Sequence, residues 1–205
     1  MKQDKILIGL TGQTGAGKSA ASDYIRKCGY PVIDADLVSR KVMAKGSRCT
    51  LELIRAFGGE ILCDDGSLNR KLLGKIVFSD PGKKDELNRI THPYILKEIF
   101  AQADGFFAGG ARAVFLDAPT LFESGADKRC DYIISIIADE EIRAARIMAR
   151  DNITPKDAAA RINAQYSDNF YSDRSDYVIV NDKDLAALSI KIEEALKSLG
   201  LLQVP

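Results

Sequence analysis

The stretch from Gly9 to Ser19 contains residues whose types and spacing suit phosphate binding. Gly12, Gly17, Lys18 and Ser19 match the pattern G-x-x-x-x-G-K-[ST]. Glycines let the backbone curl so that its N–H groups face an anion, and the lysine reaches the β- and γ-phosphates. A serine hydroxyl at the last position is a ligand for Mg²⁺. The stretch therefore predicts binding of a nucleoside triphosphate together with magnesium.

The segments on either side of this P-loop support the prediction. An apolar run over residues 6–10 predicts a strand, and residues 19–27 predict a helix whose positive end faces the loop. A glycine-rich turn with a chance lysine is the alternative, and the strand–turn–helix order argues against it. No guanine-reading motif is present, so we take ATP as the donor. We expect the nucleotide to contact Gly12, Gln13, Thr14, Gly15, Ala16, Gly17, Lys18, Ser19 and Ala20.

Three carboxylates follow predicted strands and are candidates for phosphoryl-transfer chemistry. Asp117 ends an apolar strand and is interpreted as the carboxylate that holds Mg²⁺ directly or through water. Asp36 is our candidate for the general base that accepts the proton of an acceptor hydroxyl, with Asp34 as its supporting neighbour, although the pattern leaves their order open. Each has a plainer alternative, namely a turn cap before Pro119 for Asp117 and a helix N-cap for the pair.

Arginines three and four residues apart predict one basic face on a helix. Arg143, Arg146 and Arg150 have this spacing, and Arg161 lies on the next predicted helix. Such a face beside a nucleotide suits a lid that clamps phosphates and stabilises transferred charge, with Arg143 and Arg146 as catalytic candidates and Arg150 on the nucleotide. The alternative is a solvated face paired with residues 139–141.

The elements that must position these residues alternate between strands and helices. That order predicts an α/β fold in which a five-stranded parallel sheet is flanked by helices, with ligands at the carboxyl ends of the strands. Residues 1–46 and 108–205 form the predicted core, and about 139–168 form the lid. The mostly helical residues 47–107 are too long for a simple crossover, so we interpret them as an inserted helical subdomain that binds the acceptor.

Composition excludes several functional classes. The 205 residues contain 29 Lys plus Arg and 29 Asp plus Glu, so nothing supports a nucleic-acid partner. The four cysteines lie far apart and suggest reduced thiols. No apolar run approaches the ~20 residues of a membrane span, and the amino terminus lacks signal-peptide character. We expect a cytoplasmic protein that is a monomer or a weak homo-oligomer.

Beyond the P-loop, the chain resembles the dephospho-CoA kinase family nearly from end to end. The P-loop is common to many enzymes, whereas the Asp-Ala-Asp, Thr-His-Pro and Leu-Phe-Glu stretches in this order are far more specific. The matching segments are Gly9–Gly12, Gly15, Gly17–Ser19, Val32–Asp36, Asp65–Leu68, Arg70, Phe78–Pro81, Leu87, Thr91–Pro93, Asp117–Pro119, Leu121–Glu123, Arg161–Ile162, Gln165, Asp176, Val178–Ile179 and Asn181.

The resemblance implies ATP-dependent phosphorylation of the ribose 3′-hydroxyl of dephospho-CoA, giving coenzyme A and ADP. It also implies a P-loop kinase core, a helical acceptor-binding domain and a lid. Asp36 would be the base, and the residues near the acceptor would be Arg70, His92, Leu121, Phe122 and Glu123, with Arg161 from the lid. A lone histidine such as His92 is equally well a packed or capping residue.

The sequence departs from the usual family pattern at four positions, which are Gln13, Thr14, Thr120 and Ser175. The family usually has Gly and Ile at the first two, Leu at the third and Ala at the fourth. None of these changes removes a charged group. Two other functions stay open, namely a kinase for another metabolite or nucleoside monophosphate, and an ATP-binding switch that hydrolyses slowly. The paired carboxylates Asp34 and Asp36 argue against the switch.

Overall fold

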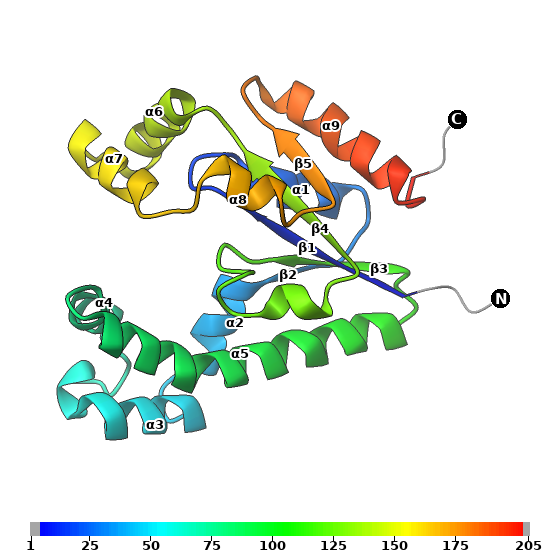
Figure 1. Cartoon of the computed structure of the whole chain (residues 1–205). Helices are drawn as coiled ribbons and strands as arrows, with labels where there is room; N and C mark the ends of the chain where they lie inside the picture. The colour runs from blue at the N-terminus through cyan, green and yellow to red at the C-terminus, as the bar shows by residue number, and fades with distance from the viewer. Residues whose placement is uncertain (1–4, 203–205) are drawn as a thin grey trace. The chain divides into compact units, whose positions relative to one another are not determined.

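The computed structural model describes residues 5–202, and its centre is a five-stranded sheet with strand order β2-β3-β1-β4-β5 (Figure 1). The ladders of β1 with β3, β1 with β4 and β4 with β5 are all parallel. The predicted parallel α/β sheet is thus confirmed. The strands are β1 Ile6–Gly12, β2 Val32–Asp34, β3 Ala113–Asp117, β4 Tyr132–Ile137 and β5 Tyr177–Val180.

α-Helices lie between successive strands except between β3 and β4, which are joined by a loop with a short 3₁₀ turn. The α-helices are α1 Lys18–Lys27, α2 Ala35–Val42, α3 Arg48–Phe57, α4 Arg70–Phe78, α5 Pro81–Ala108, α6 Glu140–Asp151, α7 Pro155–Asn163, α8 Asp168–Ser172 and α9 Leu185–Ser198. Two short 3₁₀ turns are η1 Gly59–Ile61 and η2 Ala126–Arg129.

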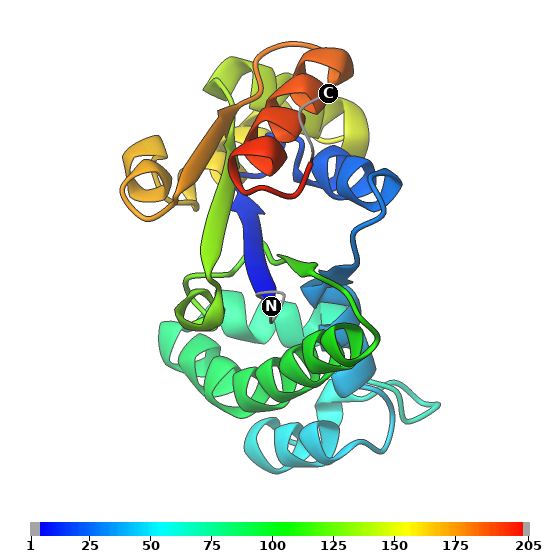
Figure 2. The ribbon, with the colours of Figure 1, turned by 90° about the vertical axis from the view of Figure 1, so that its right-hand side faces the viewer.

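The central strands are apolar because both faces of the sheet are covered. Every residue of β3 is buried, and Ile8, Leu10 and Phe115 have no exposed surface. One cluster joins these side chains to α1 and α9, through residues such as Ile25 and Leu196. In Figure 2, α1 and α9 lie on one side of the sheet and α8 on the other. The covered sheet gives the P-loop a rigid base.

Polar side chains fix where helices begin. Thr154 accepts a hydrogen bond from the N–H of Asp157 at the start of α7, where Pro155 fills the first position, as its sequence predicts. The sequence alone predicts that the helix starting at Thr154 runs to about residue 168, but α7 ends at Asn163. The chain restarts as α8 because Ser167 provides a second N-cap, accepting from the N–H of Phe170.

The chain divides into two compact units. One runs up to Ile33 and resumes at Gly105, and the other comprises Asp34–Asp104. The second unit has its own apolar core, which includes Leu53, Ile61 and Ile90. It begins at residue 34, whereas the sequence places the start of the insertion at 47.

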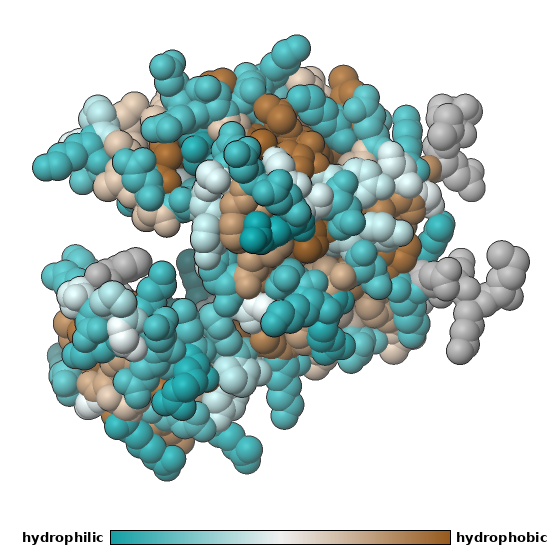
Figure 3. All heavy atoms as spheres, viewed as in Figure 1, coloured by the Kyte–Doolittle hydropathy of each residue, from teal (hydrophilic) through white to brown (hydrophobic). Residues whose placement is uncertain are grey.

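The face of the described residues that Figure 3 shows is mostly polar. Hydrophilic side chains cover most of the face drawn in Figure 3, with small apolar areas between them. Among the described residues, none of the helices combines the length and the apolar character that a bilayer span requires.

Candidate active site

The P-loop turns sharply between β1 and α1, and its glycines are required by positive φ angles and by close neighbouring atoms. Gly12, Gly15 and Gly17 have φ values of 144°, 78° and 103°. A Cβ at Gly12 would lie 2.1 Å from the carbonyl oxygen of Ile136, and one at Gly17 would lie 2.4 Å from the Nδ2 of Asn181. Because L-residues with side chains rarely adopt such φ values and no space exists here, only glycine fits. The loop therefore has the curled backbone that the motif predicts.

Lys18 is the first residue of α1, and its ammonium pairs with Oδ1 of Asp117. Asp117 ends β3 opposite Leu10 of β1, directly before the loop, so the register of the sheet brings the two together. Its second oxygen accepts from the hydroxyl of Ser22, one turn further along α1. Asp117 is only 6 % exposed. The predicted convergence of the loop and the strand-end carboxylate is present.

The segment after β5 and the side chain of Arg146 contact the backbone carbonyls of the loop. Asn181 donates from Nδ2 to the carbonyl of Ala16 at 2.7 Å. The Arg146 guanidinium donates to the carbonyls of Asn181 and Lys183 at 2.9 Å each, and to that of Gly15 at 3.4 Å. Arg146 therefore supports the loop from its carbonyl side in this structure.

The other arginines of the predicted lid have different surroundings. Arg143 is 5 % exposed and donates from Nε to the carbonyl of Ala138 at 3.0 Å, while its buried Nη1 has no partner among the described residues. Arg150 and Arg161 both pair with Asp151. The two cations lower the pKa of Asp151 to about 2, with Arg150 the larger cause. The alternative interpretation, a solvated face paired with residues 139–141, does not describe the ion pairs that form among the described residues.

The amino-terminal part of the loop contacts the segment between α7 and α8. Gln13 donates from Nε2 to Oδ1 of Asp168 at 2.7 Å, and the backbone N–H of Thr14 donates to Oε1 of Gln165 at 2.7 Å. Sequence reasoning did not identify Asp168 or the contacts of Gln165, because partners about 150 positions apart leave no local pattern. Gln13 itself is 2 % exposed, so its side chain is part of the packed loop.

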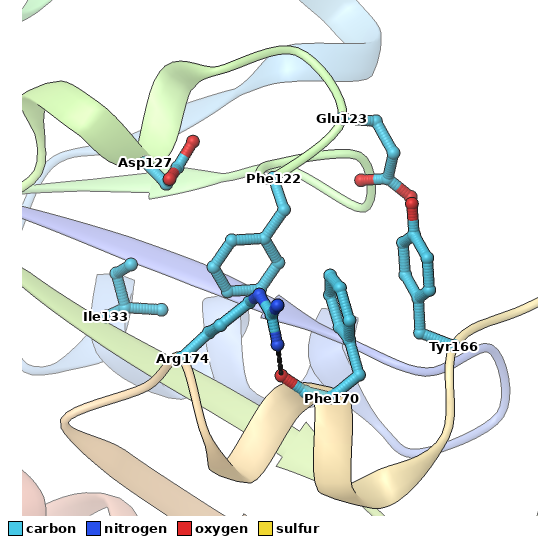
Figure 4. Close-up of a pocket in the computed structure, with 7 residues that line it drawn as sticks. All are labelled: Phe122, Glu123, Asp127, Ile133, Tyr166, Phe170 and Arg174. Atoms are coloured by element: carbon cyan, nitrogen blue, oxygen red, sulfur yellow. Dashed lines mark hydrogen bonds between the residues drawn. The ribbon is translucent and has the colours of Figure 1, made fainter.

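Two cavities adjoin this region. One, of about 430 Å³, has walls that include Gln13, Arg143, Gln165 and Tyr166. The second has a volume of about 350 Å³ and shares Tyr166 with the first. Its walls are Phe122, Glu123, Asp127, Ile133, Tyr166, Phe170 and Arg174 (Figure 4).

Aromatic side chains line the second cavity. Tyr166 stacks on Phe170 with ring centroids 3.7 Å apart, and the guanidinium of Arg174 lies 4.2 Å from the Phe170 centroid. Figure 4 shows the Tyr166 hydroxyl pointing toward the Glu123 carboxylate. Leu121, by contrast, has no exposed surface and packs where Gly9 leaves room. Phe122 and Glu123 can therefore meet a ligand here, whereas Leu121 belongs to the core.

The remaining predicted residues belong to the unit 34–104. Asp34 is the N-cap of α2, and its Oδ1 accepts from the N–H groups of Asp36 and Leu37 at 2.9 and 3.0 Å. Asp36 is exposed in the first turn. Arg70 donates to the carbonyl of Arg40 at 3.3 Å, and His92 is half-buried in α5, with its pKa lowered by burial. The capping alternative thus explains Asp34, but not the second carboxylate.

The oxygen donors near the loop suit Mg²⁺. No group of three or more His, Cys, Asp or Glu side chains suited to a metal exists within residues 5–202. Mg²⁺ at nucleotide sites takes one or two protein oxygens and completes its shell with phosphate and water. Ser19, exposed in the first turn of α1, and the Asp117 carboxylate, which pairs with Lys18 and Ser22, each carry an oxygen of that kind.

Comparisons with known proteins agree with this geometry. The sequence model of dephospho-CoA kinase matches residues 6–187. A dephospho-CoA kinase from Listeria innocua is 41% identical over 178 residues, which is 87% of this chain and 89% of that one.

Solved structures also resemble this chain. The crystal structure of TT1252 from Thermus thermophilus has a TM-score of 0.82 at 32% identity, covering 98% of this chain and 100% of that chain. The dephospho-CoA kinase from Campylobacter jejuni has a TM-score of 0.70 at 25% identity, covering 94% and 96%. A shikimate kinase from Bacteroides thetaiotaomicron, at 15% identity and a TM-score of 0.56, shares the fold alone. The chain belongs to the dephospho-CoA kinase family.

Proposed function

We propose that the protein transfers the γ-phosphoryl group of ATP to the ribose 3′-hydroxyl of dephospho-CoA, giving coenzyme A and ADP in the last step of coenzyme A biosynthesis. The proposal rests above all on the family match over residues 6–187, which includes the loop, both carboxylate regions and the lid. The glycine turn and the Lys18–Asp117 pair are the parts that a phosphate-binding site needs.

The chemistry divides between the donor and the acceptor. The N–H groups of the P-loop and the ammonium of Lys18 bind the triphosphate and stabilise the negative charge on its oxygens during transfer. The 3′-oxygen forms a bond to the γ-phosphorus as the bond from that phosphorus to the bridging oxygen of ADP breaks. The proton of the hydroxyl passes to Asp36, our proposed base. Asp34 acts on Asp36 indirectly, by capping the helix on which it lies.

Ser19 and Asp117 are the residues that we propose hold Mg²⁺. When bound, the ion would neutralise charge on the phosphates. Asp117 also pairs with Lys18 and Ser22, so its carboxylate holds the ammonium of Lys18 in place.

The roles of the lid and acceptor residues are likewise proposals. Arg143 is a buried cation beside the loop, and its Nη1 has no hydrogen-bond partner within residues 5–202, which favours a contact with the transferred group. Arg146 supports the loop, and we assign Arg150 to the nucleotide. The acceptor would meet Arg70, His92, Phe122, Glu123 and Arg161, with Leu121 supporting its neighbours from the core.

The cysteines bear on the cellular location. All four cysteines are free thiols, which favours a reducing compartment, and we propose the cytoplasm. We also propose a monomer or a weak homo-oligomer.

An acceptor panel tests the function. ADP release is measured with ATP, Mg²⁺ and, in turn, dephospho-CoA, adenosine, nucleoside monophosphates, shikimate or no acceptor, with Lys18→Ala as the control for contaminating activity. We expect ADP release that depends on dephospho-CoA and is lost in the control. Turnover with another acceptor would indicate a different metabolite kinase. ADP release without any acceptor would indicate an ATP-hydrolysing switch.

A further inference from the structure

Two consecutive residues of the P-loop are held by side chains from the segment 165–168, which joins α7 to α8. The backbone N–H of Thr14 donates to Oε1 of Gln165, and Nε2 of Gln13 donates to Oδ1 of Asp168, each at 2.7 Å. The segment is thus attached at two points to the half of the loop nearest β1. Neither bond is needed to form α7 or α8, whose own N-caps are Thr154 and Ser167.

The bond from Thr14 also determines how the Gln165 carboxamide is oriented. A backbone N–H can only donate, so the atom that meets it is the oxygen of the carboxamide. The amide nitrogen is therefore on the other branch of the same planar group, and among the described residues it has no hydrogen-bond partner. It has two N–H donors, and Gln165 lines the cavity of about 430 Å³ beside the loop. A fixed donor pair thus lies beside the P-loop, in a cavity whose walls also include the cation of Arg143 and the carboxylates of Glu140 and Asp168.

We propose that Gln165 is a phosphate-binding residue, held in place by Thr14 and donating from its amide nitrogen to an oxygen of the terminal phosphate. The proposal rests on the proposed use of ATP. A hydrogen bond to a charged oxygen is stronger than one between neutral groups, and a carboxamide supplies it without a charge of its own. The bond between Gln13 and Asp168 keeps the segment against the loop.

The place of Thr14 in the loop favours the terminal phosphate over the inner ones. The inner phosphates would meet the N–H groups at the beginning of α1, where the helix dipole acts. Thr14 is near the opposite end of the loop, shortly after β1 ends at Gly12. A contact at this end requires the γ-phosphate, so ADP cannot make it.

Nucleotide binding without an acceptor tests the proposal. Calorimetric titration compares ADP with a non-hydrolysable ATP analogue, both with Mg²⁺, on the wild type, Gln165→Glu and Gln165→Ala. Gln165→Glu keeps an oxygen for Thr14 but removes the donor and adds a negative charge. Ser172→Asp is the matched control, because Ser172 is exposed at the end of α8, lines neither cavity and would carry the added negative charge outside the proposed site.

We expect both substitutions at Gln165 to weaken binding of the ATP analogue about tenfold or more, as losing a hydrogen bond to a charged group does, and to leave ADP binding within about twofold. Ser172→Asp should leave both affinities within about twofold. Equal weakening of the two nucleotides would mean that Gln165 only supports the loop, and unchanged analogue binding would remove it from the site. Either result overturns the proposal.

Circular dichroism checks that each variant is folded. If Gln165→Ala does not fold, the nucleotide affinities of Gln165→Glu alone test the proposal. Because no acceptor is present, the result is independent of whether dephospho-CoA is the substrate. A failed acceptor panel and a failed binding experiment are therefore distinguishable.

Discussion

At the scale of single residues, the proposed reaction depends most on Asp36. We expect Asp36→Asn to bind ATP normally and to lower kcat by about 10²-fold or more, because the amide cannot accept the proton of the hydroxyl. Steady-state kinetics and ATP titration measure the two quantities. A kcat close to that of the wild type would assign the base to another group.

Lys18 has a structural partner as well as a proposed ligand. Lys18→Met leaves the buried Asp117 carboxylate with only Ser22, and we expect a loss of about 2 kcal/mol in the free energy of unfolding. Lys18→Met combined with Asp117→Asn removes the unpaired charge, so part of this stability should return while phosphoryl transfer stays lost. Urea denaturation measures the stability. If the double variant is no more stable than Lys18→Met, the unpaired Asp117 carboxylate is not the cause of the lost stability.

His92 is the chain's only histidine, and burial lowers its pKa below the ordinary value of 6.5. Below about pH 6.5 the imidazole therefore binds a proton more readily in the unfolded chain than in the folded one. The free energy of unfolding consequently decreases as the pH falls through this value. We expect wild type to lose more stability than His92→Gln between about pH 7.5 and about pH 5.5. If the urea midpoints of wild type and His92→Gln decrease equally between these pH values, burial of His92 does not make stability depend on pH.

At the scale of elements, the sequence predicts strands and helix starts well. Apolar runs, the glycine turn and caps such as Thr154 act within a few residues, so their effects can be recognised locally. The short helix α8 is missed because Ser167 begins it only four positions after α7 ends at Asn163, which resembles one continuous helix.

Asp34 provides a test of capping in α2. Asp34→Ala removes the acceptor for the N–H groups of Asp36 and Leu37, and we expect a loss of about 1 kcal/mol in the free energy of unfolding. Asp34→Asn should cost much less, because Asn caps about as well as Asp. Thermal and urea unfolding compare the two variants. Equal destabilisation would show that Asp34 contributes its charge, not its cap.

At the scale of the whole molecule, the sheet determines which site residues meet. Parallel strands place their carboxyl ends at one edge, which is why Asp117 could be predicted to lie at the loop although it is 99 positions from Lys18. The support of the loop by Arg146 and Asn181, and the contacts of Gln13 and Thr14 with residues 165–168, could not be predicted. They depend on where connecting segments pack, and side-chain contacts between distant segments leave no periodic pattern.

Identification of the product tests the central claim most directly. The wild type is incubated with ATP, Mg²⁺ and dephospho-CoA, and the product is analysed by mass spectrometry and phosphorus NMR. We predict that the acceptor gains one phosphoryl group on the ribose 3′-oxygen, with one ADP formed for each coenzyme A. Unchanged dephospho-CoA beside ADP, or a phosphate on any other oxygen, would contradict the account.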